Sequence, residues 1–115
     1  ESSRLILKEI TKYSADYPVI LSGDFNYTST AEGYKIITSK LSDSKYISKA
    51  ESAGGNITFN GFGNDIKPDN KIDFIFVNDK VEVLNHLIDT TTFIGLYPSD
   101  HFPVISLIKT SPSLK

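Results

Sequence analysis

The stretch "VILSGDFN", residues 19–26, gives the strongest indication of the fold. Its first three residues are apolar, with no polar residue between them. Such runs are typical of strands covered on both faces, as in parallel or mixed sheets layered with helices. The run ends in "GDFN" (23–26), a combination that commonly forms turns. We therefore expect a short strand that leads into a polar loop at the edge of a sheet.

Two amphipathic helices are expected on either side of this strand. The first is indicated over residues 5–17 by apolar side chains at helical spacing, and Pro18 would end it. The second is indicated from about Thr30 to Lys40, because "STAE" (29–32) matches a capping box. The expected buried stripes are Ile6, Ile10, Tyr13 and Tyr17 in the first helix, and Tyr34, Ile37 and Leu41 in the second.

Three further strands are expected in the second half of the chain. They are "KIDFIFVN" (71–78), "KVEVLNHLI" (80–88) and "FPVISLIK" (102–109), and "ND" at 78–79 predicts a hairpin turn between the first two. The connection before them is predicted to hold one helical turn within 41–55 and a short extended piece at 57–59. The predicted class is α/β, with a mixed, mostly antiparallel sheet and helices on one face.

The composition limits the possible functions. The 115 residues suit one domain, which we assign to residues 1–109 with a tail at 110–115. A net charge of -2 argues against nucleic-acid binding through electrostatics alone, and the absence of cysteine excludes disulfides and thiolate sites. The sequence contains no apolar run long enough to span a membrane.

Two candidate sites lie at strand ends. Asp24 and Asn26 offer a carboxylate and a carboxamide two residues apart at a sheet edge, where ligands often bind, although the same residues also suit an ordinary turn. Asp73 interrupts an apolar strand and needs a partner if it is buried. The alternative is that Asp73 lies at the wet end of the strand, beside Lys71.

The third candidate is "YPSDHFPV" (97–104), in which two prolines stiffen a loop that presents Asp100 and His101. Histidine is suited to proton transfer near neutral pH, and a neighbouring carboxylate can bind a metal ion. Taken alone, this pair also fits a solvated loop. His86 stands alone and is expected to pack on a strand rather than to bind a ligand.

Together, "SGDFN", "KIDFIFV" and "PSDHFPV" resemble the endonuclease/exonuclease/phosphatase superfamily, whose members have a deoxyribonuclease-I-like fold. The three motifs occur in the family's order over residues 20–104, and "ITFNGF" (57–62) is similar to its Thr-Phe stretch. The resemblance implies half of a four-layer α/β sandwich and a metal-dependent hydrolase of phosphoesters, either a phosphodiesterase or a phosphomonoesterase.

The resemblance also implies roles for the candidate residues. His101 would take a proton from water or polarise the phosphate, and Asp73 would fix its tautomer from the far ring nitrogen. Asp100 would help to bind Mg²⁺ or Mn²⁺. Asp24 and Asn26 would position the nucleophile and stabilise the charge on the phosphate, and both are further candidates for metal binding.

The resemblance covers only the C-terminal half of such a domain. The family's main metal-binding glutamate lies in the other half, so the chain alone is expected to be inactive. Its partners would be the phosphoester and the N-terminal half of the same domain. An uncovered sheet face around Phe74, Phe76 and Val104 would favour self-association or marginal stability. The alternative is a non-catalytic binding module with the same fold.

Overall fold

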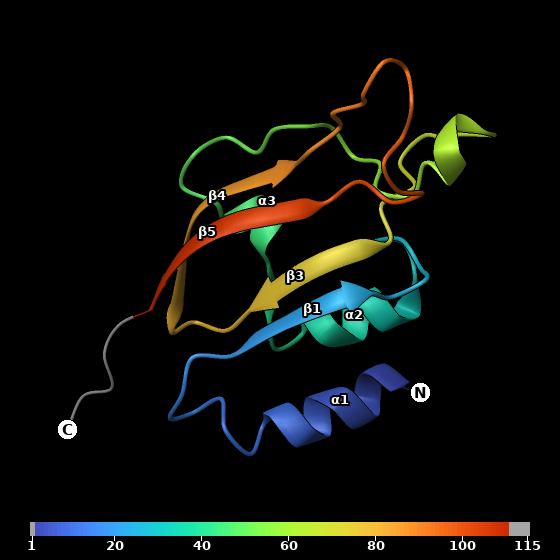
Figure 1. Cartoon of the computed structure of the whole chain (residues 1–115). Coiled ribbons are helices and arrows are strands. Elements are labelled where there is room, and N and C mark those ends of the chain that lie inside the picture. The colour runs from blue at the N-terminus through green and yellow to red at the C-terminus, as the bar shows by residue number, and fades with distance from the viewer. Residues whose placement is uncertain (1, 111–115) are drawn as a thin grey trace.

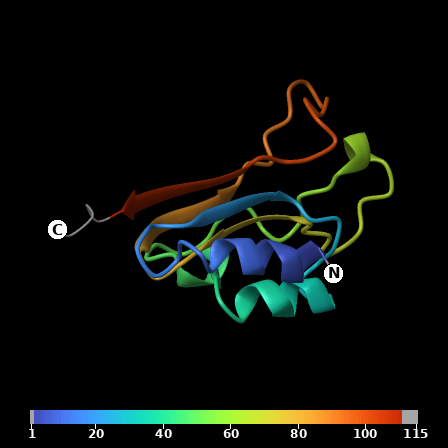
Figure 2. The same ribbon diagram turned by 90° about the horizontal axis from the view of Figure 1, so that it is seen from below.

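A computed structural model describes residues 2–110 and shows a layer of strands with helices on one side (Figures 1 and 2). The helices are α1 (Ser2–Ile10), α2 (Glu32–Thr38), α3 (Ser44–Ile47) and the 3-10 turn η1 (Gly61–Gly63). The strands are β1 (Ile20–Asp24), β2 (Ser42–Asp43), β3 (Asp73–Val77), β4 (Val81–Ile88) and β5 (Val104–Thr110). No helix in this range is long and apolar enough to cross a membrane.

The strands form two antiparallel sheets. β3 is the centre of the first and pairs with β1 on one edge and β2 on the other, whereas β4 pairs with β5 in the second. β5 runs alongside β3, so the two sheets continue one layer (Figure 1). Strands and helices therefore form the predicted mixed α/β architecture. Within residues 2–110, the one parallel contact is an isolated bridge between Ala53 and Leu87.

The predicted hairpin at 78–79 is wrong. Both edges of β3 are already occupied, so the chain turns at Asn78 and leaves for the second sheet. The Asn78 side chain stabilises this turn: Oδ1 accepts from the N–H groups of Val19 and Lys80, at 3.0 and 3.2 Å. β4 then finds its partner in β5 rather than in β3.

The main core lies between the helices and β3. Leu7, Ile37 and Leu41 pack from the helical side against Phe74 and Phe76, and all five are buried. Burying side chains of this size contributes about 1.5–3 kcal/mol each. Two of the three residues in the predicted stripe of the second helix are thus fully buried. The third, Tyr34, is half-buried and donates a hydrogen bond to Asp43 Oδ2 at 2.8 Å.

Both helices are shorter than predicted. α1 ends at Ile10, and the Asn78 amide donates to the carbonyls of Ser14 and Tyr17, which holds residues 14–17 in turns. Tyr13 and Tyr17 consequently remain 55% and 56% exposed. The capping box at 29–32 is also wrong, because the N-cap of α2 is Ala31, which makes no side-chain capping bond.

The other local predictions have mixed outcomes. The single helical turn expected within 41–55 is α3, and His86 is buried in β4 as expected for a packing residue. Burial lowers the pKa of His86 to about 4. Of the predicted tail, Thr110 is the last residue of β5, and residues 111–115 lie outside the described residues.

One face of the strand layer is uncovered. β1, expected to be covered on both faces, is exposed along most of its length. Phe74 and Phe76, expected on the open face, instead point toward the helices, and Val104 is half-buried. Side chains alternate along a strand, so the open face carries the intervening positions. Its exposed apolar residues are Ile20 (49%), Leu87 (37%), Ile105 (45%) and Leu107 (56%).

We expect the isolated chain to associate through this open face. Leu107→Lys places a charge in the face and should weaken association at least tenfold, as measured by sedimentation equilibrium, because a charged side chain resists burial. The matched control is Leu5→Lys, a position that is 63% exposed on α1, and this helix lies on the other side of the strand layer (Figure 2). A monodisperse, highly stable wild-type monomer would contradict the prediction.

Candidate active site

The register of β1 and β3 sets two carboxylates opposite each other. Asp24 ends β1, Asp73 begins β3, and the two are paired across the ladder. Like charges at directly opposed positions destabilise a strand pair. A cation at this end of the sheet would therefore be favoured.

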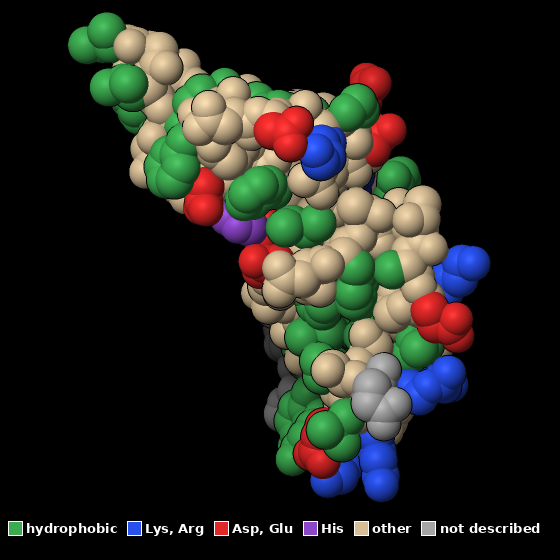
Figure 3. Space-filling model, turned by 90° about the vertical axis from the view of Figure 1, so that its right-hand side faces the viewer, with side chains coloured by type: hydrophobic (Ala, Val, Ile, Leu, Met, Phe, Trp, Pro, Cys, Tyr) green, Lys and Arg blue, Asp and Glu red, His purple; other side chains and the backbone are tan. Residues whose placement is uncertain are grey.

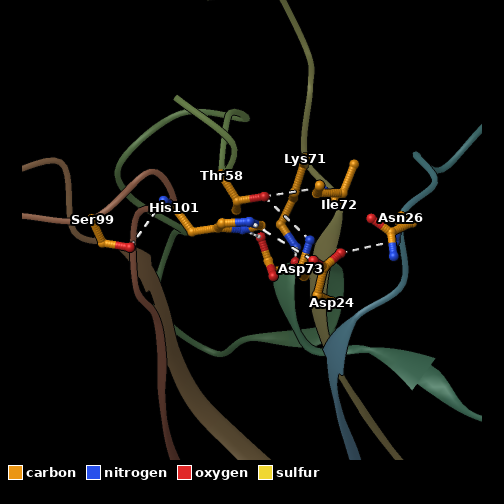
Figure 4. Close-up of polar contacts among 8 residues, drawn as sticks. All are labelled: Asp24, Asn26, Thr58, Lys71, Ile72, Asp73, Ser99 and His101. Atoms are coloured by element: carbon orange, nitrogen blue, oxygen red, sulfur yellow. Dashed lines mark hydrogen bonds and ion pairs between the residues drawn. The ribbon is translucent and has the colours of Figure 1, made fainter. Parts of the chain in front are cut away.

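The loop before β5 brings a histidine to these carboxylates (Figure 4). His101 Nδ1 lies 2.7 Å from Asp73 Oδ2, and His101 Nε2 lies 3.8 Å from Asp24 Oδ2. A carboxylate can only accept, so Nδ1 carries the proton and Nε2 of the neutral ring keeps its lone pair. The hydrogen bond to Asp73 raises the pKa of His101 above its ordinary value.

The side chains remain reachable from solvent. The exposed fractions are 41% for Asp24, 28% for His101 and 19% for Asp73. The three line one hollow of about 430 Å³ between β1, β3 and the start of β5. Figure 3 shows a surface histidine between acidic side chains. The basic ring nitrogen can therefore meet a ligand that enters from this side.

Thr58 connects the two segments that carry the pair. It is fully buried, and its Oγ1 accepts from the N–H groups of Ile72 and Asp73, at 2.9 and 3.2 Å. Its carbonyl accepts from the N–H of Phe102 at 2.7 Å, directly after His101. One residue thus fixes the backbone beside both members of the pair. In the sequence, Thr58 stands out only through the resemblance of the Thr-Phe stretch to the family, and no local pattern predicts this contact.

Lys71 also stabilises the start of β3, through a contact with Asp73. It is 3% exposed, and its Nζ donates to the carbonyl of Asp73 at 2.7 Å and lies 4.2 Å from the ring centroid of Phe74. Burial lowers its pKa to about 8. Lys71 therefore does not mark a wet strand end, which was the alternative for Asp73. Nothing in the sequence pattern indicated a buried lysine here.

Backbone contacts fix the loop around His101. The Ser99 hydroxyl accepts from the His101 N–H at 3.2 Å, and the ring of Phe59 meets the imidazole edge-on at 5.2 Å between centroids. The carbonyl of Asp100 accepts from Asn60 N and Gly61 N, at 2.8 and 3.2 Å. The predicted extended piece at 57–59 takes part through an isolated bridge between Phe59 and His101.

The remaining predicted residues lie farther from the pair. Asn26 is exposed, has a φ of 57°, and donates its backbone N–H to Asp24 Oδ1 at 2.9 Å. This is an Asx turn, so the turn interpretation holds for the backbone while Asp24 Oδ2 still faces His101. Among the described residues, the group with ligand atoms within 4.8 Å of one another is Asp24, Asp73 and His101, without Asp100.

Replacing Asp73 tests whether its carboxylate sets the proton affinity of His101. Asp73→Asn removes the charge that favours the imidazolium, so the pKa of His101 should fall toward its ordinary value. An NMR titration of the histidine ring signals in a chelator-treated sample measures this. Asp65→Asn, in an exposed loop, is the control. An unchanged pKa in Asp73→Asn would show that the hydrogen bond does not govern the ring.

The chain is similar to known proteins both in sequence and in structure. A family model described as the Endonuclease/Exonuclease/phosphatase family matches residues 4–101. No curated protein matches the chain. Several solved structures match the chain.

Three of these structures share 29–32% of their residues with the chain. A conserved protein of unknown function from Enterococcus faecalis V583 is 32% identical, with a TM-score of 0.80 over 94% of this chain and 42% of its own. An endonuclease/exonuclease/phosphatase from Bacteroides vulgatus is 30% identical, with 0.82 over 96% and 43%. A mannosyl-6-phosphatase from Bacteroides thetaiotaomicron VPI-5482 is 29% identical, with 0.83 over 94% and 44%.

The chain spans less than half the length of each of these structures. The family match, by contrast, covers most of the chain and runs from before the first motif to His101 in the third, so it includes Asp24, Asp73 and His101. The chain therefore belongs to the endonuclease/exonuclease/phosphatase family, and its strands and helices form part of that family's deoxyribonuclease-I-like α/β sandwich.

Proposed function

We propose that the protein containing this chain is a divalent-metal-dependent phosphoester hydrolase, and that His101 and Asp73 carry out its proton transfer. The observation that carries the proposal is the 2.7 Å contact between His101 Nδ1 and Asp73 Oδ2, which leaves Nε2 as a base facing an open hollow. A base held in one tautomer by a carboxylate is the arrangement that general base catalysis requires.

In the proposed reaction, Nε2 of His101 takes a proton from a water molecule. The water oxygen attacks phosphorus, and the ester P–O bond breaks as the leaving alkoxide takes up a proton from the solvent. His101 afterwards releases its proton to the solvent. Asp73 stabilises the imidazolium that forms, because the hydrogen bond is stronger to the charged ring. Asp24 also lies near the ring, at 3.8 Å from Nε2, and adds to the stabilisation of the cation.

The residues present fit a hard divalent cation. Asp24 and Asp73 face each other across the ladder, and carboxylate oxygens are ligands that Mg²⁺ and Mn²⁺ prefer. Asp73 Oδ2 is engaged by His101, so we assign Asp73 no metal ligand role. The resemblance to the family supports Asp100 as a metal ligand, and we propose Asp24 and Asn26 as further ligands. When bound, such an ion neutralises charge on the phosphate oxygens and lowers the pKa of bound water.

We further propose that the uncovered sheet face is the surface on which the N-terminal half of the same domain packs. The face is apolar at Ile20, Ile105 and Leu107, and the relatives extend well beyond the part that this chain matches. That half would supply the remaining metal ligand. The chain alone would then bind the ion weakly and have no measurable turnover.

We infer that the substrate is a phosphomonoester rather than a phosphodiester, and the similar structure of a mannosyl-6-phosphatase supports this choice. The charge of the chain supports the same choice of substrate, because a net charge of -2 offers little attraction for a polyanion.

Activity of the full-length protein tests the proposal. It should release phosphate from p-nitrophenyl phosphate with Mn²⁺, and chelation should abolish the release. His101→Ala should lower kcat/KM by about 10³-fold, because it removes the base. Asp79→Asn, at an exposed turn, should have no effect. Full activity in His101→Ala would refute the assigned role, and calorimetry without Mn²⁺ binding would refute metal dependence.

A further inference from the structure

A second, smaller cavity lies against His101, beside the hollow that holds the carboxylates. It measures about 240 Å³ and is bounded by the loop between β4 and β5 (residues 89–103). Ser99 and His101 line both cavities. A phosphoester bound at Nε2 would therefore have room for its organic group on this side.

The wall of the smaller cavity is mostly apolar. Phe93 and Phe102 contribute aromatic rings, and Pro98 and Pro103 contribute rigid apolar edges. Phe93 is 63% exposed, although exposing a large apolar side chain gains nothing for folding. Two backbone hydrogen bonds with Leu96, at 2.9 and 2.8 Å, hold this part of the loop. Phe93 thus lines the cavity from a segment whose backbone is hydrogen-bonded.

One anionic group stands among these apolar residues. Asp89 Oδ1 accepts from the N–H and the hydroxyl of Thr91, at 3.0 and 2.6 Å, and these bonds lower the pKa of Asp89. Asp89 Oδ2 makes no hydrogen bond with any described residue and is available to accept one from a ligand. No lysine or arginine lines this cavity among residues 2–110.

The apolar wall and the single carboxylate together indicate which kind of ligand fits this cavity. An engineered cavity of about 150 Å³ holds benzene, so 240 Å³ accommodates one six-membered ring with substituents. A carboxylate beside apolar surface suits a ring whose faces are C–H groups and whose edge carries hydroxyl donors. A second phosphate on the ring would face Asp89 without a cation to offset the repulsion.

We propose that this cavity, formed by Asp89, Thr91, Phe93 and Phe102, is the leaving-group site for a neutral, polyhydroxylated ring, so that the substrate is a monophosphate ester of a hexose. The inference rests on the proposed phosphoester hydrolysis at His101. Asp89 Oδ2 accepts a ring hydroxyl, and Phe93 covers the apolar face of the ring. The sugar oxygen bonded to phosphorus then points toward His101.

The test compares esters in the full-length protein. We expect kcat/KM for mannose 6-phosphate or glucose 6-phosphate to exceed that for ethyl phosphate at least tenfold, and fructose 6-phosphate to be preferred over fructose 1,6-bisphosphate. Asp89→Asn and Phe93→Ala should each lower kcat/KM for the hexose ester about tenfold and leave ethyl phosphate within twofold. Equal losses for both esters, or no preference for hexoses, would overturn the assignment.

Two controls separate this inference from the proposed function. Ile94→Ala changes the adjacent, fully exposed residue of the same loop, which does not line the cavity, and should leave every rate unchanged. Binding of the non-hydrolysable 6-phosphonate analogue of mannose, measured by calorimetry, should weaken about tenfold in Asp89→Asn. Absent hydrolysis with intact, Asp89-dependent binding refutes only the hydrolase, whereas absent binding refutes the leaving-group site.

Discussion

The hydrogen bond between His101 and Asp73 is the interaction on which the arrangement of the site depends. It joins the first residue of β3 to a loop 28 positions later in the sequence. Thr58 makes this contact possible, because its hydroxyl and carbonyl oxygens fix the backbone on both sides of it. Asp24 reaches the same point through the register of β1 against β3. Three segments from different parts of the chain thus converge only after the sheet has formed.

The site also explains why an apolar strand begins with a carboxylate. A carboxylate at the start of an otherwise apolar strand costs free energy unless it has a partner. Asp73 obtains that partner in His101, and the buried ammonium of Lys71 holds its carbonyl. On the open side, the sheet ends in charged groups while its middle stays apolar. The rim can therefore meet a charged ligand while the adjoining face can meet another protein surface.

The strands that carry the three motifs could be predicted from the sequence, because apolar runs and turn residues are local signals. The sequence did not predict which strands pair. The turn at Asn78 has the composition of a hairpin, yet β3 has both edges occupied, and only the assembled sheet reveals this. The end of α1 depends on a side chain more than sixty residues away. Lys71 and Thr58 act on main-chain atoms, and such contacts leave no pattern in the sequence.

The most direct test of the central claim, that the rim beside His101 binds a metal ion and a phosphate, is a crystal structure of the full-length protein with Mn²⁺ and orthophosphate. The account predicts an anomalous manganese peak among the carboxylates of Asp24 and Asp100, and a phosphate oxygen within hydrogen-bond distance of His101 Nε2. Manganese and phosphate bound elsewhere, with this rim empty, would contradict it.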